Sequence, residues 1–163
     1  MIKKKRKQFK SGIYRPKNIE KFGESKCLYR SSYELQFLKW CDNHPKILSV
    51  QYEKIIIPYV CKTDSKLHKY YVDCRIMMRE STGPKKYLIE IKPFRQTIPP
   101  KTSNRKKLST ILEENFNWIK NNQGKWPAAK QYCKKMGWRW CILTEKGIYI
   151  DDKFYEGKLL GSP

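Results

Sequence analysis

The chain has few acidic residues for its length and no long apolar run. Only 15 of its 163 residues are Asp or Glu, against 36 Lys or Arg, so its formal net charge is +21. Such a surface repels copies of itself and attracts polyanions, of which nucleic acid is the natural partner. No stretch approaches the roughly 18 apolar residues of a membrane helix. The first seven residues are too basic and polar for a secretory signal, so we expect no membrane association.

The sequence also lacks paired metal-binding cysteines. Its six cysteines form no CxxC pair, and the two histidines, His44 and His68, stand in unrelated segments. This spacing argues against a zinc site. Most of the cysteines fall within apolar runs and are predicted to be reduced core residues, which is typical of a reducing cytoplasm. With 39% hydrophobic and 13% aromatic residues, the chain can build a real core.

The apolar pattern predicts an α/β fold in the order αβββαβ. The expected elements are a helix from Ser31 to about residues 42–43, strands near 50–57, 68–78 and 86–92, helices at 108–121 and 127–136, and strands at 138–143 and 148–150. A right-handed crossover through the later helices would return strand 138–143 parallel to strand 86–92. We therefore expect a mixed β-sheet flanked by helices on both faces.

Composition divides the chain into three parts. Residues 1–26 form a basic arm with little periodicity, and a solubilising tail or partly ordered loop on one side and a phosphate-tracking arm on the other are equal alternatives. Residues 27–150 carry the predicted elements and are expected to form one domain. Residues 151–163 lose the pattern and are predicted to be a tail outside the fold, whose last three residues could be vector-derived.

Four charged residues occupy positions where these elements should be apolar. Asp73 lies in the second predicted strand, and Glu90 and Lys92 form an E-x-K motif in the third. Residues two apart on a strand share a face, so Glu90 and Lys92 point the same way. Glu34 lies in the middle of the apolar stripe of the first helix. Unpaired charge in apolar elements is costly, and such clusters are more often functional than accidental.

The four residues have the chemistry of a metal-dependent nuclease. Asp73 and Glu90 offer the hard oxygen ligands that Mg²⁺ prefers, with Mn²⁺ as an alternative, and the carbonyl of Ile91 offers a third. Glu34 would approach from its helix, directly or through water. Lys92 would position the attacking water or stabilise the charged transition state. One metal or two could bind, and no small-molecule cofactor is expected.

Each of these residues also has a purely structural interpretation. Asp73 could pair with Arg75, and Glu90 with Lys92 as an ion pair within the sheet. Glu34 could be only the capping-box partner at the start of the first helix. The combination favours a shared metal site, because two carboxylates and a lysine stand in apolar strands while a third carboxylate points into the core.

A basic loop follows the E-x-K strand. Residues 94–107 contain Pro99-Pro100 and a series of cations, and their length is typical of a segment that becomes ordered with its ligand. The expected contacts to DNA phosphates are Arg30, Arg95, Lys101, Arg105, Lys106 and Lys107. No recognition helix stands apart from the predicted core, so we expect double-stranded DNA to be bound with little sequence preference.

The order of these motifs resembles the PD-(D/E)xK nuclease superfamily, and within it the TnsA-type transposon endonucleases. The likeness is carried by RSSYE at 30–34, VQYE at 50–53, YVD at 71–73 and EIKP at 90–93. It implies a restriction-endonuclease-like core, Mg²⁺-dependent DNA cleavage, and the same four site residues. The proline that usually precedes the aspartate is Val72 here, a variation that this superfamily tolerates.

The chain is also similar, over about residues 1–150, to the head-completion proteins of T-even-like tailed bacteriophages. This resemblance implies a role after DNA packaging, with phage portal, neck or head proteins as partners. It also implies a location in the host cytoplasm during assembly, or in the virion. A nuclease there could trim DNA at the portal before tail joining. The alternatives are a non-catalytic basic protein that plugs or stabilises the portal, and a single-strand or RNA binder that uses the aromatics.

Overall fold

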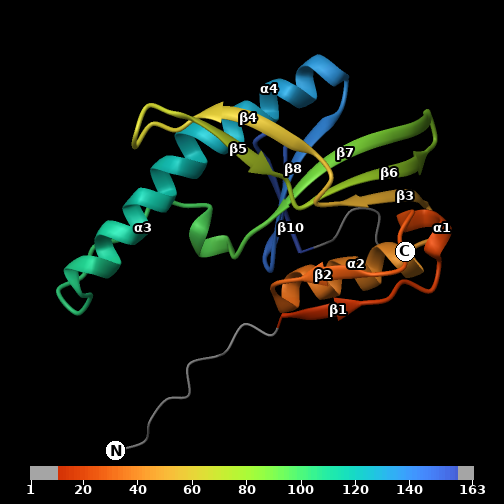
Figure 1. Cartoon of the computed structure of the whole chain (residues 1–163), viewed down its shortest axis with the longest axis horizontal. Helices are drawn as coiled ribbons and strands as arrows, with labels where there is room; N and C mark the ends of the chain where they lie inside the picture. Colours follow the sequence, from red (N-terminus) through yellow and green to blue (C-terminus); the bar gives the residue numbers. More distant parts are fainter. Residues whose placement is uncertain (1–10, 158–163) are drawn as a thin grey trace, which may run out of the picture.

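A six-stranded mixed sheet forms the centre of the fold (Figure 1). The computed structural model describes residues 11–157, and the structural statements below concern these residues. The strand order is β10-β9-β8-β7-β6-β3. The strands are β3 (Ile47–Tyr52), β6 (Cys74–Glu80), β7 (Gly83–Ile91), β8 (Arg139–Thr144), β9 (Gly147–Ile150) and β10 (Lys153–Glu156). Strand β8 pairs parallel to β7, as predicted, and the other neighbours in this sheet are antiparallel.

Helix α2 (Ser32–Asn43) covers one face of this sheet. It begins where the sequence predicts, because the side chain of Ser31 accepts a hydrogen bond from the backbone N–H of Glu34. Phe37 and Leu38 are buried in a cluster that includes Ile89 of β7, together with other residues of β3, β6 and β8. This cluster is the larger half of the core.

The opposite face is covered by helix α4 (Trp126–Met136) and by a separate hairpin of β4 (Ile56–Val60) and β5 (Leu67–Tyr71). Trp126, Ala129 and Cys133 of α4 are buried with Leu88 of β7, whose side chain alternates with that of Ile89. The predicted α/β class, with helices on both faces of a mixed sheet, is therefore confirmed. The six cysteines are buried and unpaired, as predicted for reduced core residues.

The strand predicted over residues 68–78 is wrong, because the chain changes sheets in the middle of it. Strand β5 ends at Tyr71 and β6 begins at Cys74, so Asp73 lies in the break. The backbone N–H of Val72 still donates to the carbonyl of Ile55, which directly precedes β4 of the hairpin. The carbonyl of Asp73 instead accepts from the backbone N–H of Glu53, which directly follows β3. The apolar run continues through the break, so composition alone does not show it.

The N-terminal part of the chain is ordered against α2. Residues 1–10 of the predicted basic arm lie outside the described residues. The rest forms β1 (Gly12–Tyr14), α1 (Ile19–Phe22) and β2 (Cys27–Tyr29). This segment is held by Asp42 near the end of α2, which accepts hydrogen bonds from the Tyr14 hydroxyl at 2.6 Å and the backbone N–H of Lys17 at 2.7 Å.

Helix α3 (Leu108–Lys120) projects away from the rest of the structure (Figure 1). It was predicted to present one apolar face, and that face is largely exposed at Leu108, Leu112 and Phe116. A π-helical turn, η2 (Asn121–Lys125), joins α3 directly to α4. The sequence pattern predicts two helices, at 108–121 and 127–136, and no regular structure between them. A short 3₁₀ turn, η1 (Phe94–Gln96), begins the basic loop. In the described part of the chain, no helix is long and apolar enough to cross a membrane.

The segment left out of the predicted fold contributes a strand. Residues 153–156 form β10, which pairs with β9 at the edge of the sheet. Lys153 is opposite Ile150, so Asp151 and Asp152 form the two-residue turn between the strands. Both have positive φ angles, 46° and 72°. This is the conformation of a type I′ hairpin turn, which aspartate tolerates better than most residues.

Candidate active site

The pairing of β6 with β7 brings Asp73 beside the E-x-K motif. The strand register, continued by one residue, places Asp73 opposite Glu90. Asp73 Oδ2 accepts a hydrogen bond from the backbone N–H of Ile91 at 2.7 Å. Lys92 Nζ lies 3.1 Å from Glu90 Oε1, so these two side chains share a face of β7, as predicted. The structure therefore gathers three of the four central residues at the end of one strand.

The electrostatics of this cluster are strongly unfavourable for a second negative charge. Burial and the charge of Glu90 raise the pKa of Asp73 well above its usual range, against the opposing effects of Lys92 and the Ile91 N–H. For Lys92, burial alone would lower the pKa, but the charges of Glu90 and Asp73 outweigh it and raise the pKa. One lysine therefore faces two carboxylates, and an added cation would relieve their repulsion.

Glu90 is fixed by a tyrosine from the other sheet. The Tyr70 hydroxyl of β5 donates to Glu90 Oε2 at 2.5 Å, and only 1% of Tyr70 and 2% of Glu90 are exposed. Burial and the charge of Glu90 raise the pKa of Tyr70 well above its usual range, so it stays a hydrogen-bond donor. Sequence reasoning missed this residue, because nothing local distinguishes it from the exposed Tyr71 beside it.

Glu34 combines its capping role with a contact to the sheet. Its backbone N–H donates to Ser31 Oγ, while its carboxylate accepts from the Ser31 hydroxyl and from the backbone N–H of Arg30. The Tyr52 hydroxyl of β3 also donates to Glu34 Oε2, at 2.5 Å. The charge of Glu34 is the weakest of the influences on the pKa of Asp73. The capping box is thus present, and a metal-binding role for Glu34 stays a prediction.

A groove of about 680 Å³ begins at Lys92 and extends between the basic loop and α3. Six cations contribute to its lining, and they are Lys92, Arg95, Lys101, Lys106, Lys120 and Lys125. Two glutamates, Glu113 and Glu114, line it as well, and Glu114 forms an ion pair with Lys106 at 2.5 Å. The groove is therefore basic overall and reaches the carboxylate cluster through Lys92.

The predicted phosphate contacts fall into two groups. Arg95, Lys101 and Lys106 line the groove, whereas Arg105 and Lys107 are exposed outside its lining. Arg30 lies beside α2 and forms an ion pair with Glu53 at 2.9 Å. The first group stands where a DNA backbone could continue from the carboxylates. Roles for the second group in DNA binding stay predictions.

Lys125 is a further candidate that the sequence analysis did not select. It lies in the π-helical turn η2, lines the groove, and places its ammonium 5.3 Å from the centre of the Tyr70 ring. Burial, together with the charges of Lys92 and Lys120, lowers its pKa. The turn lies so close to β4 that a side chain at Gly124 would place its Cβ only 3.0 Å from the Tyr59 ring. Single π-helical turns are frequent at functional sites, but they have no reliable sequence signal.

Residues 44–145 match the family of TnsA-like endonuclease N-terminal domains, and the chain belongs to this family. The match includes Asp73, Glu90 and Lys92 and leaves out Glu34. The chain is also 36% identical over 146 residues to the head completion nuclease of Enterobacteria phage T4, with 85% of this chain and 93% of that protein covered. The two comparisons confirm the resemblances inferred from the motifs.

Proposed function

We propose that this protein is a metal-dependent DNA endonuclease that acts in phage head completion. The observation that carries the proposal is the placement of Asp73 and Glu90 beside Lys92, whose side chain lines a basic groove. Membership of an endonuclease family supports it. The relative named head completion nuclease supports the place of that activity in virion assembly.

The donor set fits a hard divalent cation. Asp73 and Glu90 would hold Mg²⁺, or Mn²⁺ as an alternative, with the Ile91 carbonyl and Glu34 as further candidate ligands. Burial and the neighbouring charge of Glu90 raise the pKa of Asp73, and a bound cation would offset both effects. When bound, such a cation supplies an acidified water and neutralises charge on the scissile phosphate.

The chain's own residues have separate tasks in this proposal. Lys92 holds a positive charge beside Glu90, where it can donate to the attacking water and stabilise the charged phosphate of the transition state. Tyr70 keeps the Glu90 carboxylate in one orientation. Lys125 adds a second cation on the groove side of the cluster.

We propose double-stranded DNA as the substrate, bound by its phosphates. Arg95, Lys101 and Lys106 line the groove beyond Lys92, and contacts of this type do not depend on base sequence. In head completion, the substrate would be DNA protruding from the portal, trimmed in the host cytoplasm before the tail joins. The partners would be portal, neck or head proteins.

A non-catalytic protein that plugs the portal is the second candidate, and the high net charge is compatible with it. The carboxylates discriminate between the two. A protein that only binds phosphate gains nothing from Asp73 and Glu90 beside its basic groove, since they repel the ligand. The cluster therefore favours the enzyme.

Cleavage of supercoiled plasmid tests the proposal directly. With Mg²⁺, the wild-type protein should nick and linearise the plasmid, and EDTA should abolish the activity. Asp73→Ala and Lys92→Ala should each lose at least about a hundredfold in rate. Both should still bind a DNA duplex in a fluorescence anisotropy assay.

Lys134→Ala is the matched control, since it removes an exposed lysine of α4 outside the groove lining and should keep its cleavage rate. Wild-type cleavage by Asp73→Ala would identify a contaminating nuclease and end the assignment. The role in assembly can be tested separately, by supplying the Asp73→Ala protein to infected cells that lack the wild-type protein. Filled heads without tails should then accumulate, with longer accessible DNA ends than wild-type heads.

A further inference from the structure

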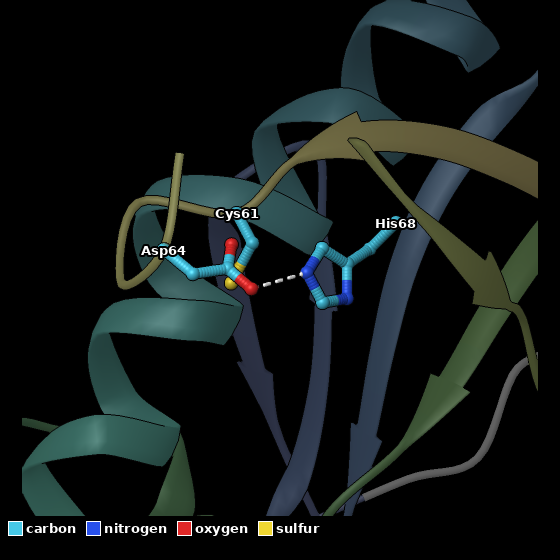
Figure 2. Close-up of side chains that lie close together, drawn as sticks. All are labelled: Cys61, Asp64 and His68. Atoms are coloured by element: carbon cyan, nitrogen blue, oxygen red, sulfur yellow. Dashed lines mark hydrogen bonds and ion pairs between the residues drawn. The ribbon is translucent and has the colours of Figure 1, made fainter. Parts of the chain in front are cut away.

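A second cluster of metal-binding side chains lies outside the active site, at the turn of the β4–β5 hairpin. Figure 2 shows the side chains of Cys61, Asp64 and His68 converging on one side of this turn. One ligand atom of each lies within 4.8 Å of those of the other two. His68 Nε2 is 2.8 Å from Asp64 Oδ2. The spacing of the sequence argued against a zinc site, because it contains no CxxC pair and does not show that the hairpin returns His68 to Cys61.

The backbone of the turn holds these side chains in place. The N–H of Cys61 donates to the carbonyl of Lys66 at 2.9 Å, and the N–H of Ser65 donates to the carbonyl of Cys61 at 2.8 Å. Asp64 Oδ1 accepts from the N–H of Lys66 at 3.0 Å, which leaves Oδ2 directed at His68. The cluster is therefore ordered by the chain itself, and binding a cation there costs little additional order.

The chemistry of the donors indicates the class of cation. A thiolate, an imidazole and a carboxylate are ligands for Zn²⁺, whereas Mg²⁺ prefers oxygen alone. Two residues lie between Cys61 and Asp64, and three lie between Asp64 and His68. Spacings of this size are within the ranges of known zinc ligands. We propose that Cys61, Asp64 and His68 bind one Zn²⁺ ion, with a fourth position left to water.

Access and ionisation agree with this assignment. The Cys61 thiol is buried, but the side chains of His68 and Asp64 are 35% and 40% exposed, so a cation can enter from solvent. The Thr63 hydroxyl lies 2.9 Å from the Cys61 sulfur and can donate a hydrogen bond to a thiolate there.

The site would stiffen the hairpin that carries Tyr70. The His68 ring lies 5.8 Å from the ring of Tyr59, which is in turn 6.5 Å from the ring of Tyr70. Tyr70 donates its hydroxyl to Glu90. A zinc ion at the turn is therefore connected by packed rings to the active-site carboxylate, although it contributes no ligand or charge to the reaction itself.

Cobalt titration of the full-length protein, first freed of metal with a chelator, tests the proposal. The near-ultraviolet absorption of sulfur-to-cobalt charge transfer should appear and saturate with one equivalent of Co²⁺ at this site, whatever binds at the active site, and Zn²⁺ should abolish it. Cys61→Ala should lose this band. Cys133→Ala is the control, because Cys133 is another buried thiol in the same half of the hydrophobic core but is not part of the proposed site. This variant should keep the charge-transfer band. The Asp73→Ala variant should also keep it, which separates this ion from one bound at the active site.

A second variant protects the test against misfolding of Cys61→Ala. His68→Gln alters a partly exposed side chain and leaves the thiol in place, and it should weaken Co²⁺ and Zn²⁺ binding by at least about tenfold. A wild-type protein without the charge-transfer band would overturn the proposal. So would a band that survives in Cys61→Ala, or equal affinities for wild type and His68→Gln. In each of those cases, Asp64 and His68 form only an ion pair.

Discussion

Asp42 and Asp73 occupy opposite electrostatic environments in the same fold. Asp42 is 1% exposed and accepts hydrogen bonds from Tyr14, from the backbone of Lys17, and from both the backbone and side chain of Asn18. Burial opposes its ionisation, but these donors lower its pKa to about 2. Among the described residues, the carboxylate of Asp73 accepts one hydrogen bond, from the backbone N–H of Ile91, and its pKa is raised.

The difference separates a structural carboxylate from a functional one. The fold supplies Asp42 with the donors that a negative charge requires, so the residue stabilises the native state as it stands. It leaves Asp73 buried beside the charge of Glu90, with one N–H donor and the charge of Lys92 to offset it, so a further favourable partner has to come from outside the chain.

The largest effect is expected for Asp73→Asn. The amide oxygen can still accept from the Ile91 N–H, so the fold should persist, but a cation loses a charged ligand. The cleavage rate should fall by about 10³-fold, measured in a single-turnover plasmid nicking assay. A loss of less than about tenfold would mean that Asp73 is as structural as Asp42.

Asp42→Ala should act on stability instead. It leaves the Tyr14 hydroxyl and two backbone N–H groups without their acceptor, which should lower the free energy of unfolding by about 2–4 kcal/mol. Urea denaturation measures this loss, and the cleavage rate per folded molecule should be unchanged. Glu156→Ala, at an exposed position of β10, is the control and should change stability by less than about 0.5 kcal/mol.

The two aspartates should also affect the pH dependence of stability at opposite ends. The lowered pKa of Asp42 gives a stabilisation that is present above pH 4 and is lost as the pH falls towards about 2, amounting to about 2 kcal/mol. The raised pKa of Asp73 has the opposite effect on the free energy of unfolding. Its stabilising contribution is fully present below about pH 4 and is lost as the pH rises through the raised pKa.

Melting temperatures measured across this pH range in EDTA check both signs. Asp42→Asn should flatten the decline on the acid side, and Asp73→Asn should flatten the decline towards higher pH. An Asp73→Asn protein that loses stability with rising pH as steeply as wild type would show that another group is responsible.

Tyr70→Phe should have the smallest effect of these substitutions. The substitution keeps the packing of the ring and removes the donor to Glu90, which frees one carboxylate oxygen. The cleavage rate should fall by about tenfold, because the loss of one such hydrogen bond is equivalent to about 1–2 kcal/mol. Tyr71→Phe, at an exposed neighbouring position, should cleave at the wild-type rate. Equal rates for the two variants would remove Tyr70 from the site.

The sequence was informative where the determining interactions are local. The Ser31 capping box marks the start of α2, and strand alternation places Glu90 and Lys92 on one face. The chain's departure from one sheet to the other at Asp73 could not be predicted, because it depends on which backbone groups the neighbouring segments leave free.

Longer-range contacts account for the other differences. The bond from Tyr70 to Glu90 joins residues 20 apart that lie in different sheets, so no spacing rule identifies it. The periodicity of α3 correctly predicted an apolar face, but periodicity does not say whether another element covers it, and Leu108 is 70% exposed. The loss of the apolar pattern over residues 151–163 predicts a tail outside the fold, whereas Asp151 and Asp152 form the turn into β10.

The parallel pairing of β7 with β8 has a consequence for protein synthesis. The backbone N–H of Lys92 donates to the carbonyl of Leu143, 51 residues later in the chain, at 3.0 Å. The ribosome therefore releases the segment with Asp73, Glu90 and Lys92 well before the strand that fixes the lysine backbone exists. A product of premature termination before Leu143 therefore carries Asp73, Glu90 and Lys92 without the backbone partner of Lys92. The site is completed only when the chain has been synthesised beyond β8.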